Sequence, residues 1–156
     1  MRDWSLAFVA GMGSALLLAA ALFFEMVMGM APCTLCIWQR WPHAAAVALG
    51  VLAWVAPVLP VILAGAAAAA TSGVIGIYHT GVERGWFDGP AACAGGGDIS
   101  RLSAEELLDR ILAAPVVRCD EVPWEMLGLS MASWNVVASF GLALLWLAAL
   151  RRPPAC

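Results

Sequence analysis

The chain has 156 residues, of which 63% are hydrophobic and only 12% are charged. Its mean hydropathy is +0.87, whereas a soluble domain carries roughly 25% charged residues. This composition excludes an ordinary soluble domain and indicates a protein embedded in a lipid bilayer. The length fits one unit, so we expect residues 1–156 to form a single membrane domain. Because the formal net charge is −3 and lysine is absent, no nucleic-acid partner is expected.

Three apolar stretches are each long enough to cross a bilayer. A span needs about 20 predominantly apolar residues to cover roughly 30 Å of hydrocarbon. The stretches that meet this requirement are residues 4–24, 61–78 and 132–150. The first could instead be a secretory signal, but its apolar core exceeds the usual length of about 7 to 15 residues. We therefore expect it to be a retained span.

A fourth stretch, residues 37–56, is interrupted by Arg40 and Pro42. The uncharged turn at residues 57–60 joins it to the next apolar run, so both sides of that turn should be spans. The sequence thus predicts an all-α membrane protein built as a four-transmembrane-helix bundle.

Arginine placement predicts which side each loop faces. Arg2 precedes the first span, and Arg151 and Arg152 follow the last one. Four spans place both termini on one side, which the positive-inside rule makes cytoplasmic. The loops at residues 25–36 and 81–131 then face outward, where disulfides persist.

Residues 103–112 of the long outer loop predict a short amphipathic helix on the membrane surface. Ser103-Ala104-Glu105-Glu106 forms a capping box. After it, apolar and charged residues alternate with helical spacing, so that one face is apolar and the other is charged. Such a helix lies in the membrane interface.

Two cysteine pairs are expected on the outer side. Cys33 and Cys36 form a Cys-x-x-Cys motif next to the first span, while Cys93 and Cys119 lie in the long polar loop. A Cys-x-x-Cys pair commonly lowers the pKa of one sulfur and is the usual redox unit. Cys156 is expected to be cytoplasmic, reduced and without a role.

Other uses of these cysteines compete with redox exchange. A structural zinc site usually needs two close pairs, and the wide separation of Cys93 and Cys119 disfavours it. Structural disulfides could staple the outer loop of a non-enzymatic four-span scaffold or transporter. However, a Cys-x-x-Cys bridge closes a very small loop and stabilises little, so we favour redox exchange. The methionines at 26, 28 and 30 are better explained as apolar filler than as a copper site, and no metal is expected.

Net oxidation of thiols needs an electron acceptor. The sequence lacks a dinucleotide or flavin glycine fingerprint and a haem-attachment motif, which leaves a lipid-soluble acceptor such as a quinone. A quinone needs an apolar slot with a few polar donors. Arg40, four residues after Cys36, and His79, at the outer end of the third span, are the candidates. The alternative for each is an anchor at the membrane interface.

Several motifs together resemble one known family, the disulfide bond formation protein B (DsbB) family. They are Pro32-Cys33-Thr34-Leu35-Cys36-Ile37-Trp38-Gln39-Arg40, Tyr78-His79-Thr80, Arg118-Cys119-Asp120, and Trp124 to Met131 followed by Trp134. The resemblance covers the whole chain, and the motifs occur in the family's order. It departs at Gln39, where an acidic residue often stands, and at Pro42.

The resemblance implies an inner-membrane protein that reoxidises a periplasmic DsbA-like dithiol oxidase and passes the electrons to a quinone, either ubiquinone or menaquinone. It assigns Cys33 and Cys36 to the quinone-coupled pair, Cys93 and Cys119 to the pair that meets the partner, and Arg40 and His79 to the quinone site. The vitamin K epoxide reductase family shares this chemistry, but there the Cys-x-x-Cys motif lies on the last core helix. Here it follows the first span.

Overall fold

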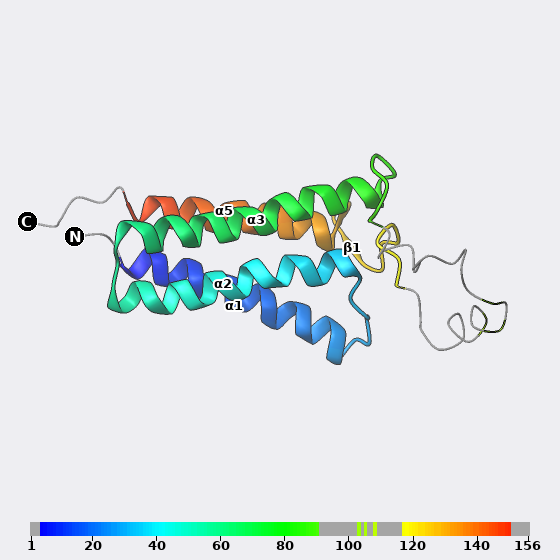
Figure 1. Cartoon of the computed structure of the whole chain (residues 1–156), viewed down its shortest axis with the longest axis horizontal. Helices are drawn as coiled ribbons and strands as arrows, with labels where there is room; N and C mark the ends of the chain where they lie inside the picture. Colours follow the sequence, from blue (N-terminus) through cyan, green and yellow to red (C-terminus); the bar gives the residue numbers. More distant parts are fainter. Residues whose placement is uncertain (1–3, 91–102, 104, 106–107, 109–116, 151–156) are drawn as a thin grey trace, which may run out of the picture.

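Four long helices lie side by side in an elongated bundle (Figure 1). The computed structural model describes residues 4–90, 103, 105, 108 and 117–150. In chain order its elements are α1 (Trp4–Met26), α2 (Thr34–Val55), α3 (Leu59–Glu83), β1 (Glu125–Met126), β2 (Leu129–Ser130) and α5 (Met131–Ala148). Helix α2 packs between α1 and α3, α3 packs against α5, and α5 returns to α1. The four helices therefore enclose a common interior.

Three of these helices are long and apolar enough to cross a membrane, namely α1, α3 and α5. This confirms that the three uninterrupted stretches predicted from hydropathy form helices long and apolar enough to be spans. Helix α2 has 22 residues, about 33 Å at 1.5 Å per residue, but it carries Gln39, Arg40 and His43 and is not among the helices apolar enough to qualify. The fourth span therefore remains a prediction.

The boundaries of α2 and α3 bring the site residues into helices. Helix α2 begins at Thr34 because Cys33 caps it, with its sulfur accepting a hydrogen bond from the backbone N–H of Cys36. Pro42 lies inside α2 without ending it. Helix α3 continues to Glu83, beyond the predicted end at residue 78. As a result, Cys36 and His79 both belong to regular helices.

Small residues allow the helices to approach closely. A Cβ atom added to Gly50 would lie 2.8 Å from the Cα atom of Gly11, so the backbones of α1 and α2 are nearly in contact. Gly65 of α3 similarly faces the ring of Trp146 in α5. The buried core around these contacts consists mainly of alanine, with Ile62 and Trp146 as its large members. Close packing of small residues is the usual means of association of helices in lipid.

A short hairpin precedes α5 in the region predicted only as loop. Strands β1 and β2 pair in antiparallel register, Glu125 with Ser130 and Met126 with Leu129. Leu127 and Gly128 both have positive φ angles, of 56° and 75°, as a type I′ turn requires. Ser130 then caps α5. The predicted surface helix at 103–112 falls almost entirely outside the described residues.

Candidate functional site

The two thiols of the Cys-x-x-Cys motif lie together at the first turn of α2. The sulfur atoms of Cys33 and Cys36 are 2.9 Å apart, and both cysteines are free. Cys33 is buried and Cys36 is partly buried. Because helix N-termini favour negative charge, this position suits a thiolate.

His79 reaches the same thiols from α3. Its Nε2 atom lies 3.5 Å from the Cys33 sulfur. A hydrogen bond from Cys36 is the main reason that the pKa of Cys33 is lowered to about 4; burial opposes this effect, and the hydrogen bond from His79 supports it. Cys33 is therefore the sulfur of the pair that carries the negative charge at neutral pH.

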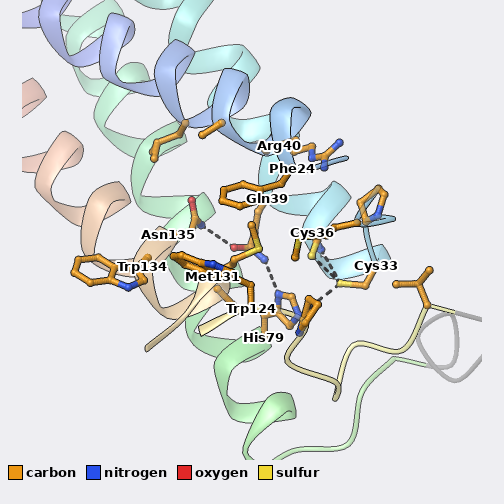
Figure 2. Close-up of a pocket in the computed structure, with 18 of the residues that line it drawn as sticks. Phe24, Cys33, Cys36, Gln39, Arg40, His79, Trp124, Met131, Trp134 and Asn135 are labelled. Atoms are coloured by element: carbon orange, nitrogen blue, oxygen red, sulfur yellow. Dashed lines mark hydrogen bonds between the residues drawn. The ribbon is translucent and has the colours of Figure 1, made fainter. Parts of the chain in front are cut away.

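Gln39 connects His79 to the rest of the bundle (Figure 2). Its Nε2 atom lies 2.9 Å from His79 Nδ1, and its Oε1 atom accepts a hydrogen bond of 2.7 Å from Asn135 of α5. In the sequence, Gln39 stands out only as a departure from the family pattern, and Asn135 does not stand out. The available signal was an uncharged polar residue within an apolar helix, because such residues need partners inside a membrane.

The polar chain continues inward from Asn135. The Oδ1 atom of Asn135 lies 3.0 Å from His43 Nε2, and His43 Nδ1 lies 3.3 Å from the hydroxyl of Ser14. Ser72 donates to the backbone carbonyl of Gln39. All four long helices thus contribute to one buried hydrogen-bond network, in which His79 is the member that the sequence predicted as a site residue.

Arg40 has a partner that the sequence analysis did not anticipate. Its guanidinium forms an ion pair with the carboxylate of Glu25 in the last turn of α1. Both side chains are partly exposed, at 23% and 34%, and Arg40 lines the same pocket as the two thiols. The positive charge of Arg40, which the sequence assigned to the quinone site, is therefore paired with the carboxylate of Glu25.

A cavity of about 370 Å³ opens beside the thiols. Its polar wall includes Cys33, Cys36, Arg40 and His79, whereas much of the rest is apolar or aromatic. The aromatic and larger apolar members shown in Figure 2 are Phe24, Trp124, Met131 and Trp134. Ligand pockets are typically lined in this way, with a few polar groups in an apolar surface.

Cys119 lies beside the first pair. It is buried and packs in one cluster with Cys33, Leu35 and Val82, and it takes part in a disulfide. Cys93 and Cys156 lie outside the described residues. The structure thus brings Cys33, Cys36, Arg40, His79 and Cys119 to one end of the bundle.

Two further features of the site involve possible metal ligands and a buried acid. Cys33, Cys36 and His79 each offer one ligand atom, and these atoms lie within 4.8 Å of one another. Cysteine sulfur and histidine nitrogen are ligands that zinc accepts. Glu83 accepts a hydrogen bond from Ser130, and its Oε1 atom lies 3.9 Å from His79 Nε2. A carboxylate and a thiol of the pair thus both approach the Nε2 atom of one imidazole.

A dithiol beside an apolar pocket in a helical membrane bundle defines a membrane disulfide oxidoreductase. Residues 3–149 match the family model of disulfide bond formation protein DsbB. The chain belongs to this family of bacterial inner-membrane proteins, and its function is disulfide bond formation.

Curated relatives agree with the family match. The chain is 33% identical to disulfide bond formation protein B of Stutzerimonas stutzeri (strain A1501), over 95% of this chain and 94% of the relative. It is 31% identical to disulfide bond formation protein B of Shewanella sp. (strain MR-4), over 83% and 77%. It is also 31% identical to disulfide bond formation protein B 2 of Pseudomonas syringae pv. syringae (strain B728a), over 92% and 86%.

Proposed function

We propose that this protein reoxidises a DsbA-like periplasmic dithiol oxidase and passes the two electrons to a membrane quinone, ubiquinone or menaquinone. The observation that carries the proposal is the pair of free thiols, Cys33 and Cys36, at the polar wall of a cavity whose other walls are largely apolar. A quinone has the same division, with a polar head and an apolar tail. When bound, it would accept two electrons and two protons and so oxidise the pair to a disulfide.

The chain's own residues support the thiol side of this reaction. Cys33 is charged at neutral pH because hydrogen bonds from Cys36 and His79 lower its pKa, and a thiolate is the reactive form. Arg40 supplies a permanent positive charge and several donors at the cavity. We assign Arg40 and His79 to the quinone site, Arg40 as a donor to the head group and His79 as the part of the wall that contacts the Cys33 thiol.

The exchange steps balance over two cysteine pairs. The partner's thiolate attacks a Cys93–Cys119 disulfide at Cys93, which releases Cys119 as a thiolate. Cys119 then attacks the Cys33–Cys36 disulfide at Cys33 and releases Cys36 as a thiolate. Cys93 and the partner's second cysteine resolve the two mixed disulfides, so the partner gains a disulfide and Cys33 and Cys36 become a dithiol. The packing of Cys119 in one cluster with Cys33 supports this order.

The proposal includes a topology. We propose that the chain is a single membrane domain in which α2 is the fourth span, both termini are cytoplasmic, and the cysteine end faces the periplasm. The packing of α2 between α1 and α3 along the bundle supports this (Figure 1), because its polar residues Gln39 and His43 are buried inside the bundle rather than exposed to lipid.

Two single variants test the assignment of the pairs. Cys36→Ala should abolish quinone reduction by purified protein in lipid nanodiscs, whether the electrons come from the partner or from a small dithiol. Cys93→Ala should abolish the mixed disulfide with the partner yet retain part of the reduction by the small dithiol, because Cys33 and Cys36 remain. Equal loss of both activities in both variants would refute the division of roles. Unchanged thiol counts in the wild-type protein after quinone is added would instead favour a stapled, non-enzymatic scaffold.

A further inference from the structure

The orientation of the Gln39 side-chain amide is determined by its neighbours. Its Nε2 atom lies 3.1 Å from the backbone carbonyl oxygen of Leu35, which can only accept a hydrogen bond. Its Oε1 atom faces Asn135 Nδ2, and that nitrogen also lies 3.4 Å from the backbone carbonyl oxygen of Ser72. The backbone carbonyl of Leu35 identifies the side-chain nitrogen of Gln39, and that of Ser72 identifies the side-chain nitrogen of Asn135. These contacts fix the orientation of both amides.

This orientation determines where the proton of His79 lies. Gln39 Nε2 carries two hydrogen atoms, and the one not directed to Leu35 faces His79 Nδ1 at 2.9 Å. Nδ1 must then be an acceptor, and the single proton of a neutral imidazole lies on Nε2. That nitrogen is the one 3.5 Å from the Cys33 sulfur. Gln39 and His79 are only 6% and 3% exposed, so water does not compete for these groups.

We propose that Gln39 is a positioning residue that holds neutral His79 in the Nε2–H tautomer, so that His79 donates a hydrogen bond to the Cys33 thiolate and does not act as its base. A carboxylate at position 39 would accept from Nδ1–H and leave the Nε2 lone pair facing Cys33, which is the arrangement of a base. The same placement of the proton opposes a metal at Cys33, Cys36 and His79, because a ligating Nε2 must be unprotonated.

The other ionisable groups around His79 are compatible with this assignment. They are Cys33 and Cys36 at the start of α2 and Glu83 on α3, whose Oε1 atom lies 3.9 Å from Nε2. Both Glu83 and a Cys33 thiolate are acceptors, so each favours a proton on Nε2. The inference deepens the proposed function, because it concerns the charge on Cys33 in the reduced pair, but its tests use neither quinone nor partner.

The tautomer can be observed directly in the full-length reduced protein. The chain has two histidines, so specific 15N labelling gives two ring systems, and a His79→Ala variant assigns them. We expect the nitrogen resonances of His79 near neutral pH to show a protonated Nε2 and an unprotonated Nδ1. Protonation at Nδ1, alone or together with Nε2, would overturn the proposal without any variant of Gln39 having to fold.

A double-mutant cycle tests whether Gln39 acts through His79. The pH midpoint of Cys33 alkylation, followed by peptide mapping in reduced protein, should rise by about one unit or more in His79→Ala, as expected for one hydrogen bond to a thiolate. It should rise by a smaller amount in Gln39→Met, because Cys33 and Glu83 still favour a proton on Nε2. The double variant should show no rise beyond that of His79→Ala, because the second change removes an interaction already lost. Additive shifts, or no shift in Gln39→Met, would overturn the proposal.

A matched control lies on the outer face of α3. Thr71 is exposed and bonds only the carbonyl of Ala67 among the described contacts, so Thr71→Val should leave both the His79 resonances and the Cys33 midpoint unchanged. If Gln39→Met lowers the reactivity of Cys33 while quinone reduction proves absent from the wild type, the positioning role stands and the proposed function fails. If the wild type reduces quinone but Gln39→Met leaves the reactivity of Cys33 unchanged, only the positioning role is rejected.

Discussion

At the scale of single residues, Cys33 combines burial with an unusual number of groups that favour its charged form. A buried thiol normally has a raised pKa because burial disfavours the thiolate. Here the Cys36 sulfur lies 2.9 Å from the Cys33 sulfur, His79 Nε2 lies 3.5 Å from it, and the backbone N–H of Cys36 donates to it. These contacts outweigh burial and lower the pKa of Cys33 to about 4.

The first prediction is that the charge on Cys33 depends mainly on Cys36. In reduced wild-type protein, the alkylation rate of Cys33 should be nearly constant between about pH 6 and pH 8, because a thiol with a pKa of about 4 is already ionised there. In Cys36→Ala the rate should rise with pH over this range, because the strongest donor is gone. The same cysteine in denatured protein gives the profile of an ordinary thiol for comparison. A steep rise in the wild type would contradict the assignment.

Arg40 and Glu25 provide a second prediction at this scale. If Arg40 binds the quinone, Arg40→Lys should retain more activity than Arg40→Gln, because lysine keeps the charge but loses the planar set of donors. Both variants should raise the quinone KM, by up to about tenfold for one lost hydrogen bond, and leave exchange with the partner nearly normal. Steady-state kinetics across a quinone titration measures this.

Glu25→Gln is the matched control for Arg40. It removes the ion pair with Arg40 but leaves the arginine in place at the cavity. If Arg40 serves the quinone, Glu25→Gln should keep a KM near that of the wild type. If Arg40 serves only to hold α1 against α2, then Glu25→Gln and Arg40→Gln should have the same effect on stability and neither should change the KM.

At the scale of elements, the close contact between α1 and α2 determines how the site is assembled. Ser14 and Glu25 of α1 reach His43 and Arg40 of α2, and the two helices approach closely at Gly11 and Gly50. A larger separation would lengthen both polar contacts. The glycines are therefore linked to the geometry of the polar chain as well as to packing.

The third prediction compares two glycines in helices. Gly50→Ala should destabilise the bundle by about 1 to 3 kcal/mol, because the added Cβ meets backbone at 2.8 Å. Gly141→Ala is the control, since nothing lies within 4 Å of its added Cβ, and it should leave stability unchanged or raise it by up to about 1 kcal/mol through helix propensity. Unfolding in mixed micelles measures both. Equal effects of the two substitutions would show that the α1–α2 contact is not tight.

At the scale of the whole molecule, the polar chemistry is concentrated at one end. The start of α1 and the end of α5 lie at the opposite end from the cysteines and the hairpin (Figure 1). Arginines occur before α1 and after α5, and under the positive-inside rule the proposed topology puts that end in the cytoplasm. In that topology the cysteine end faces an oxidising compartment, in which a disulfide exchange enzyme can act.

The fourth prediction tests this orientation. After reduction, an impermeant maleimide added to intact spheroplasts should label Cys93 and Cys119, and more slowly the less accessible Cys33 and Cys36, but should spare Cys156. Permeabilised cells provide the control in which Cys156 is labelled as well. Labelling of Cys156 alone in intact spheroplasts would reverse the topology and reject the proposed partner, which is periplasmic.

The sequence by itself determined the local features of this protein. Hydropathy located α1, α3 and α5, and the spacing of Cys33 and Cys36 indicated a redox pair. The order of the motifs indicated the family. These features depend on residues that are neighbours in the chain or repeat along one helix, so they can be recognised without knowing how the helices pack.

Only the tertiary structure decided the partners of the site residues. The contact of Gln39 with Asn135, and that of Arg40 with Glu25, join different helices, and each depends on how those helices are rotated and how closely they approach. Composition is insensitive to such rotations. Gln39 and His43 lower the hydropathy of α2, yet both are buried members of the network that contacts His79. Burial inside a membrane protein requires each such polar group to find a partner.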